Sequence, residues 1–115
     1  CSISLINMNN ENLTKTHIEL YKNGSKWLET PYLNGQEHGT QTGFYPNGSI
    51  MSKVAYVNGR RHGTEIQFRM DGTKRWEAPY VKGKEHGTWI HYHEDGSKEE
   101  KVVWKNGEFV TSKRF

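Results

Sequence analysis

A seven-residue motif that recurs every 24 residues constrains the fold of this chain more than any other feature. The motif opens with Asn-Gly or Lys-Gly and ends in His-Gly-Thr, and it occupies residues 34–40, 58–64 and 82–88. A second mark, Asn-Gly or Asp-Gly, keeps the same step at residues 23–24, 47–48, 71–72 and 95–96. Self-similarity at a fixed period is the signature of a repeat architecture, in which each unit stacks on its neighbours.

Each unit contains two short runs that favour β-strands. The first runs cover residues 16–22, 40–46, 64–70 and 88–94, and the second runs cover residues 25–33, 49–57, 73–81 and 97–105. The first runs end in Asn-Gly or Asp-Gly, a strong hairpin signal because type I′ turns need positive φ at both central residues. We therefore predict an all-β fold: an elongated antiparallel β-meander of eight to nine strands, built from 24-residue hairpin repeats over residues 14–115.

Apolar residues occupy even-numbered positions of both runs, and they predict a single apolar face. In the first runs these positions are Ile18, Thr42, Ile66, Ile90 and Leu20, Phe44, Phe68, Tyr92. In the second runs they are Thr30, Val54, Ala78, Val102 and Tyr32, Tyr56, Tyr80, Trp104. Side chains alternate along a strand, so we expect all four columns on one face, with the last four rings in a row. Gly39, Gly63 and Gly87 are predicted to have positive φ, or to abut a ring that leaves no room for a Cβ.

Composition favours a thin sheet and argues against nucleic-acid binding and a membrane-spanning helix. Only 32% of the residues are hydrophobic, too few for a thick core, although the 12% of aromatic residues exclude disorder. The 16 basic and 13 acidic residues are interleaved, which describes a solvated surface and not a nucleic-acid footprint. No apolar run approaches the roughly 20 residues of a membrane-spanning helix.

Residues 1–13 lack the period, and we expect them to form a flexible N-terminal tail. Cys1 is the only cysteine, so no disulfide can form within the chain. A cysteine in first position is typical of a bacterial lipoprotein after signal-peptide removal. Cys1 would then be the lipid anchor, the tail a tether, and the location the bacterial cell envelope. The alternative is that Cys1 merely marks where the sequence was cut, and the protein is cytoplasmic.

The residues of one complete unit carry a family likeness. Tyr21 and Gly24 are followed by Tyr32, by Asn-Gly-x-x-His-Gly at residues 34–39, and by an aromatic pair before Gly48. This pattern resembles the MORN repeat, in the variant form common in bacterial proteins, and it extends from residue 16 to about residue 110. The last unit departs from the pattern, as expected of a cap. The resemblance implies an elongated antiparallel meander used as a binding scaffold. Some MORN proteins are proposed to contact anionic phospholipids, and the bacterial variants resemble YwqK-like antitoxins and small immunity proteins.

We find no pattern that indicates catalysis, a cofactor or a metal site. No catalytic triad order, nucleophile elbow or phosphate-binding loop occurs. The histidines before Gly in the motif recur at a spacing of roughly 10 Å in a sheet, too far apart to share a zinc ion. We expect these imidazoles to bond loop backbone instead.

The binding residues predicted on the face opposite the apolar columns are Trp89, His91, His93, Arg69 and Tyr45. Trp, Tyr and Arg dominate binding energy where a partner excludes water. We therefore expect a non-enzymatic protein-binding module, an antitoxin or immunity protein that neutralises a partner toxin. The alternative is a scaffold for anionic phospholipids or the envelope surface. Contact with a membrane is otherwise expected only through a lipid on Cys1, no nucleic-acid partner is expected, and the oligomeric state is left open.

Overall fold

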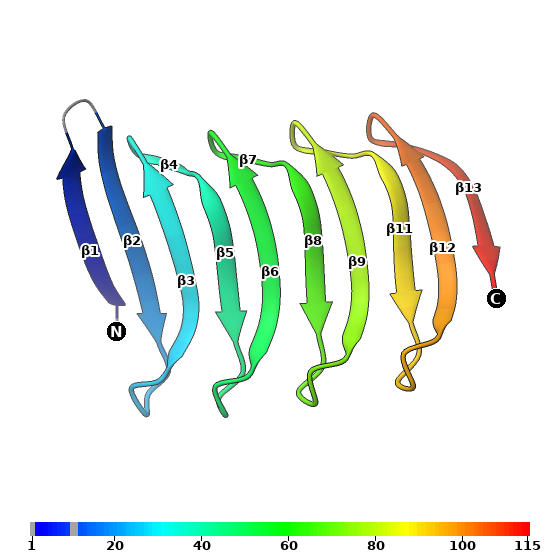
Figure 1. The fold of residues 1–115 in the computed structure, drawn as a ribbon, viewed down its shortest axis with the longest axis horizontal. Helices are drawn as coiled ribbons and strands as arrows, with labels where there is room; N and C mark the ends of the chain where they lie inside the picture. Colours follow the sequence, from blue (N-terminus) through cyan, green and yellow to red (C-terminus); the bar gives the residue numbers. More distant parts are fainter. Residues whose placement is uncertain (1, 10–11) are drawn as a thin grey trace.

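The computed structural model describes residues 2–9 and 12–115, and its strands form one open antiparallel sheet (Figure 1). The long strands run in sequence order across the sheet: β1 (Ser2–Asn9), β2 (Asn12–Leu20), β3 (Lys26–Leu33), β5 (Gly39–Phe44), β6 (Ile50–Val57), β8 (Gly63–Phe68), β9 (Lys74–Val81), β11 (Gly87–Tyr92), β12 (Lys98–Lys105) and β13 (Glu108–Arg114). Three two-residue strands pair beside this path: β4 (Gln36–Glu37), β7 (Arg60–Arg61) and β10 (Lys84–Glu85). The predicted all-β hairpin meander is confirmed. The described part holds 13 strands where eight to nine were expected, because the ends and the motif loops also form strands.

The predicted flexible tail is wrong for the residues described. Ser2–Asn9 forms β1, which pairs with all of β2 except Leu20, from Ser2 opposite Glu19 to Asn9 opposite Asn12. The edge of β2 offers unpaired N–H and C=O groups, and pairing with them requires no repeat pattern in the added strand. Ile3, Leu5 and Ile6 remain exposed in β1, so backbone pairing, more than side-chain burial, holds this strand. Cys1 lies outside the described residues.

The two kinds of turn differ from the prediction in their type. At Asn34-Gly35 both residues have positive φ, 50° and 86°, as a type I′ turn requires. At Asn23-Gly24 only the glycine does, because the Asn23 Oδ1 accepts hydrogen bonds from the backbone N–H and the hydroxyl of Ser25. The Gly24 N–H donates to the Tyr21 carbonyl, which makes a three-residue loop.

A bulge beyond each of these three-residue loops determines which side chains share a face. Leu20 lies opposite Lys26, but the next pair is Glu19 with Leu28, so Trp27 has no partner. Equivalent shifts occur after Gly43, Gln67 and His91. Opposite residues in an antiparallel pair point to the same side, and a one-residue shift exchanges the faces. Beyond the bulge, even-numbered residues of the first strand therefore share a face with odd-numbered residues of the second.

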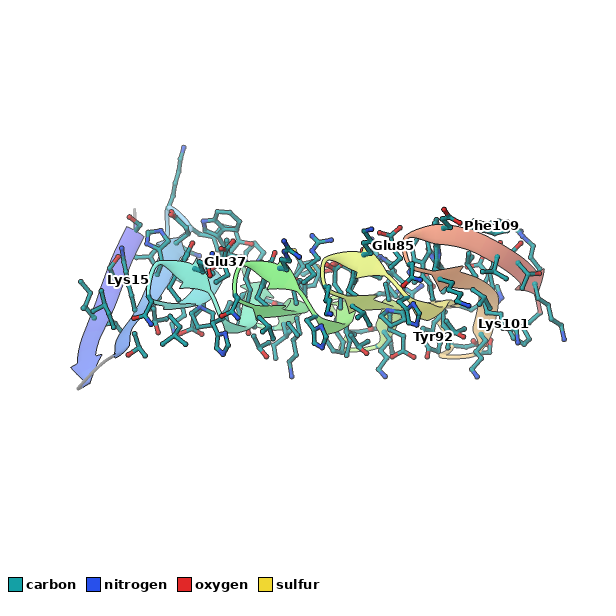
Figure 2. All side chains as sticks on the ribbon, turned by 90° about the horizontal axis from the view of Figure 1, so that it is seen from above. Lys15, Glu37, Glu85, Tyr92, Lys101 and Phe109 are labelled. Atoms are coloured by element: carbon teal, nitrogen blue, oxygen red, sulfur yellow. The ribbon has the colours of Figure 1, made fainter. Side chains whose placement is uncertain are left out.

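The prediction of one apolar face for all even columns is consequently wrong. Ile18 lies opposite Glu29, whereas Thr30 lies opposite His17 and Tyr32 opposite Lys15. The columns that begin with Ile18 and Leu20 occupy one face, and those that begin with Thr30 and Tyr32 occupy the other. Figure 2 shows the consequence: the sheet is a single layer with side chains on both sides, Lys15, Glu37, Glu85 and Phe109 on one and Tyr92 and Lys101 on the other.

Burial is accordingly shallow. The described buried residues are Ile18, Val54 and Ala78, the polar Thr30 and Glu65, and Gly43, and no large side chain among them is completely enclosed. The molecule measures 48 × 34 × 17 Å, and its shortest dimension is close to the thickness of one sheet with its side chains.

The second glycine of the motif has the predicted geometry in all three loops. Gly39, Gly63 and Gly87 have φ of +111°, +113° and +118°. A Cβ on Gly87 would lie 2.9 Å from the Cγ of Pro79, and one on Gly63 would lie 3.2 Å from the Cβ of Ala55. Pro79 is tolerated within β9 because it stands opposite this loop, where its carbonyl accepts from the His86 N–H and its nitrogen needs no acceptor.

Candidate binding site

Four aromatic rings form the predicted row along the sheet. Tyr56 lies opposite Gly39 and Arg61, Tyr80 opposite Gly63 and Glu85, and Trp104 opposite Gly87 and Phe109. Tyr32 lies on the same side, since β3 alternates from Leu28, which is opposite Gly43. The glycine beside each ring leaves room for it to lie across the sheet. We call the side that carries Tyr32, Tyr56, Tyr80 and Trp104 the aromatic face.

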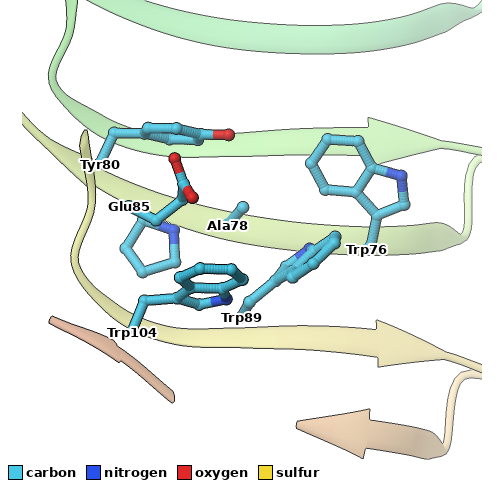
Figure 3. Close-up of a pocket in the computed structure, with 7 residues that line it drawn as sticks. Trp76, Ala78, Tyr80, Glu85, Trp89 and Trp104 are labelled. Atoms are coloured by element: carbon cyan, nitrogen blue, oxygen red, sulfur yellow. The ribbon is translucent and has the colours of Figure 1, made fainter. Parts of the chain in front are cut away.

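A pocket of about 350 Å³ opens on the aromatic face between the last two rings of the row (Figure 3). Its lining residues come from β9, β10, β11 and β12, and they are Trp76, Ala78, Pro79, Tyr80, Glu85, Trp89 and Trp104. Trp76 and Trp89 meet edge to face, with ring centroids 6.0 Å apart and planes at 86°. We call this the tryptophan pocket. It contains three of the four tryptophans of the chain.

The pocket arises where two columns of the repeat that hold other residue types in earlier units have indoles. Trp76 stands in the column of Leu28 and Ser52, and Trp89 stands in the column of Gln41 and Glu65. The Nε1 atoms of Trp89 and Trp104 are shielded and have no hydrogen-bond partner in the described part of the chain. A buried donor without an acceptor lowers stability, so these rings are held by packing and not by hydrogen bonds.

The equivalent place one unit earlier is occupied by an arginine. The Arg61 guanidinium lies 5.3 Å from the centroid of the Tyr80 ring, and its Nη1 is 3.2 Å from Oε1 of Glu65. Arg61 also hydrogen-bonds to the hydroxyl groups of Tyr56 and Tyr80. Burial raises the pKa of the Glu65 carboxyl above its usual range, although Arg61 acts in the opposite direction. Burial and the nearby Glu65 raise the pKa of Tyr80 as well.

The structure divides the five predicted binding residues into two groups. Trp89 and His91 are in contact, with ring centroids 4.8 Å apart. Both lie on the aromatic face, because Trp89 is opposite Val102 and His91 is opposite Trp76. The expectation that Trp89 and His91 point away from the tyrosine row is therefore wrong, and the cause is the bulge described above.

Tyr45, Arg69 and His93 lie instead where the first strands enter their turns. The Tyr45 hydroxyl donates to the Phe68 carbonyl at 2.6 Å. Arg69 donates to the carbonyls of Tyr92 at 2.8 Å and His93 at 3.2 Å. Tyr45 and Arg69 thus link each unit to the next through backbone acceptors, while the His93 side chain is exposed. Their role toward a partner stays a prediction.

The motif histidines bond loop backbone, as expected. Nδ1 of His38, His62 and His86 lies 3.4, 3.3 and 3.2 Å from the backbone nitrogens of Asn58, Lys82 and Asn106. Each imidazole thus accepts from the turn of the following unit. Among the residues that the structure describes, no three His, Cys, Asp or Glu side chains are grouped so as to hold a metal ion.

The face opposite the aromatic face combines apolar and charged residues. The Tyr92 hydroxyl donates to Glu77, and Lys74 forms an ion pair with the same carboxylate at 3.2 Å. These contacts lower the pKa of Glu77, whereas burial and the hydrogen bond to Glu77 raise the pKa of Tyr92 to about 12. Charges of both signs alternate on this face, since Glu29, Lys53, Glu77 and Lys101 occupy one column, and they form no field of one sign.

Of the seven lining residues of the pocket, the predicted binding set contained only Trp89; it lacked Trp76, Ala78, Pro79, Tyr80, Glu85 and Trp104. Tyr80 and Trp104 were recognised as a row but were assigned to the other side from Trp89. Two tryptophans at positions where earlier units have Ser52 and Glu65 were a visible signal. Interpreting that signal required the register, which places β9 and β11 side by side with Trp76 opposite His91.

Comparisons with known proteins identify the repeat and the fold. The family described as "MORN repeat variant" matches residues 37–58 and 85–106, which are equivalent parts of two units. No curated protein matches the sequence. Among the solved structures, a TarM mutant from S. aureus in complex with fondaparinux, alpha-GlcNAc-glycerol and UDP matches 92% of this chain with 10% identity and a TM-score of 0.52. Another crystal structure of TarM matches 93% with 11% identity and a TM-score of 0.53.

These matches differ in what they show. The chain spans about a fifth of the length of the TarM chains, at 20% coverage, so the likeness concerns the sheet fold alone. The family match locates the repeat that the resemblance implied. In the described residues, no helix is long and apolar enough to span a membrane.

Proposed function

We propose that this chain, in which two units match the MORN repeat variant, is a non-enzymatic binding module whose tryptophan pocket holds a protein partner. The observation that supports this most strongly is the pocket itself. Three indoles and a tyrosine line a hollow of about 350 Å³ on a sheet only one layer thick. Concave sites lined by aromatic side chains are where partners bind, and Trp, Tyr and Arg contribute most to interface energy.

The chemistry of the lining favours recognition over catalysis. Its side chains are aromatic or small, and Glu85 supplies the single carboxylate. General acid–base catalysis needs a proton donor or acceptor held by a partner group, and nucleophilic catalysis needs an activated nucleophile. Glu65, a carboxylate of the preceding unit on the same face, forms an ion pair with Arg61.

The finer form of the proposal is an antitoxin or immunity protein that neutralises a toxin by covering it. It draws on the resemblance to YwqK-like proteins and on the open sheet, whose aromatic face carries the tryptophan pocket. If Cys1 carries a lipid, the interaction takes place at the cell envelope; otherwise it takes place in the cytoplasm.

The test is to capture the partner from the native cell with wild-type protein and then measure its affinity for purified variants by calorimetry. Trp89→Ala removes one wall of the pocket and is expected to weaken binding at least tenfold. Trp27→Ala is the matched control, because Trp27 is 40% exposed and lies outside the pocket. Circular dichroism verifies that both variants fold.

Equal affinity of Trp89→Ala and wild type would refute a role of the pocket. Vesicles of phosphatidylglycerol, sedimented with the protein at low and high salt, test the alternative function. Salt-sensitive binding to these vesicles, unchanged by Trp89→Ala, would favour a surface-binding scaffold over a protein-binding module.

A further inference from the structure

We propose that the tryptophan pocket receives a positively charged side chain, arginine or lysine, from the partner. This inference rests on the proposed function and specifies its chemistry. It is drawn from a comparison between two consecutive units of the same chain, one of which contains its own cation where the other is open.

In the earlier unit, the chain fills the equivalent position itself. The Arg61 guanidinium lies over the Tyr80 ring, 5.3 Å from its centroid, and its Nη1 is 3.2 Å from the Glu65 carboxylate. It also hydrogen-bonds to the Tyr56 side chain. A cation held between an aromatic face and a carboxylate is stabilised by the ring quadrupole and by charge pairing. The repeat geometry thus already accommodates a guanidinium at this place on the aromatic face.

In the next unit, the site again contains aromatic rings and a carboxylate, but the arginine is replaced. Glu85 stands in the column of Arg61, and Trp104 stands in the column of Tyr80. Trp89 replaces Glu65, so the carboxylate now comes from the strand β10 and not from the first strand of the hairpin. The result is a carboxylate and four rings around open space, with no basic side chain in the lining (Figure 3).

Charge and shape together favour a cation over a neutral ligand. Glu85 lies opposite Tyr80 and lines the pocket with Trp89 and Trp104, so a guanidinium entering there meets ring faces and a carboxylate together. A sugar stacks on one flat, open ring face, but Trp76 and Trp89 meet at 86° and form a corner. The corner suits a planar group on a slender stem, such as the arginine side chain.

The first experiment titrates the ¹⁵N-labelled protein with N-acetyl-arginine methylamide and follows the indole N–H signals of the four tryptophans by NMR. We expect signals of the pocket tryptophans to shift and that of Trp27 to stay in place. The citrulline analogue, which has the same shape without the charge, is expected to bind at least fivefold more weakly. Equal binding of the two compounds overturns the proposal, as does tighter binding of N-acetylglucosamine at the same signals.

Three variants test whether the Glu85 carboxylate is responsible for binding the arginine probe. Glu85→Gln keeps the shape of the side chain and is expected to weaken arginine binding at least fivefold. Glu37→Gln is the matched control, because Glu37 holds the equivalent position two units earlier, and it is expected to leave binding unchanged. Glu85→Arg installs the residue found at Arg61 and is expected to abolish binding by filling the pocket. Unchanged affinity in both Glu85 variants overturns the proposal.

Affinity measurements with the captured partner distinguish this inference from the proposed function. If Trp89→Ala weakens partner binding and Glu85→Gln does not, the pocket binds the partner as proposed, but the inference of a cationic side chain is wrong. If the arginine probe binds as expected and neither variant affects the partner, the pocket selects cations but the proposed interface is wrong.

Discussion

Replacing Gly87 with alanine tests how far the motif glycine determines the stability of the sheet. Its φ is +118°, and a Cβ would lie 2.9 Å from the Cγ and 3.4 Å from the Cβ of Pro79. A non-glycine residue held in such a backbone conformation costs about 1–3 kcal/mol. The rigid proline ring cannot move aside as a flexible side chain would, and overpacking adds about 1 kcal/mol or more. We therefore expect Gly87→Ala to lower the free energy of unfolding by roughly 3 kcal/mol.

Gly96 supplies the matched control. Its φ is +90°, also positive, but a Cβ there would meet nothing within 4 Å. Gly96→Ala should therefore show backbone strain alone, about 1–2 kcal/mol. The two variants differ mainly in the contact with Pro79, so the difference between them measures that contact.

Urea denaturation followed by far-UV circular dichroism gives both values. With a slope of about 1.5 kcal/mol/M, a loss of 3 kcal/mol lowers the midpoint by about 2 M. In a Pro79→Ala background, Gly87→Ala should cost about 1 kcal/mol less, because the clashing ring is absent. The reasoning is refuted if both glycine variants cost the same within about 0.5 kcal/mol and the Pro79 background changes nothing.

Three further predictions concern polar contacts. Arg69→Ala should lower the free energy of unfolding by about 2 kcal/mol, because the guanidinium donates to three backbone carbonyls. Arg69→Tyr should recover most of this loss, since it restores the residue found in earlier units. Thermal denaturation of the two variants tests both expectations. The pKa of Glu77 is lowered in the folded state, so its contribution is present above the usual carboxyl pKa and is lost as the pH falls through the lowered value. Tyr92→Phe should flatten that acid limb, measured as urea midpoint against pH. The pKa of Glu65 is raised, so stability should fall as the pH rises from the usual carboxyl pKa through the raised value. Glu65→Gln should remove this decline, and an unchanged profile would contradict the assignment.

Much of the fold could be predicted from local signals. The period of 24 residues, the turn dipeptides and the strand lengths specify an antiparallel meander, because each depends on residues close together in the chain. Gly63 and Gly87 could be recognised in the same way, since a loop that needs positive φ selects glycine locally. The strand β1 could not, because its pairing with β2 depends on an open edge and not on a sequence pattern.

The candidate site was predicted only in part, and for one reason. Trp89 and His91 were correctly linked, since they stand two residues apart on one strand. Tyr45 and Arg69 were grouped with them by column, although their side chains extend to backbone carbonyls of the next unit. What a long polar side chain reaches depends on the neighbouring strand, which the column alone does not describe.

The sequence by itself thus determined the repeat, its two long strands per unit, the positions of the turns and the row of rings from Tyr32 to Trp104. Only the tertiary structure decided which of these elements meet. The bulge at Trp27 and its counterparts shift the register by one residue, and side chains alternate with a period of two. That shift places Trp89 on the same face as Tyr80 and Trp104. The tryptophan pocket therefore forms from residues that had been expected on opposite faces of the sheet.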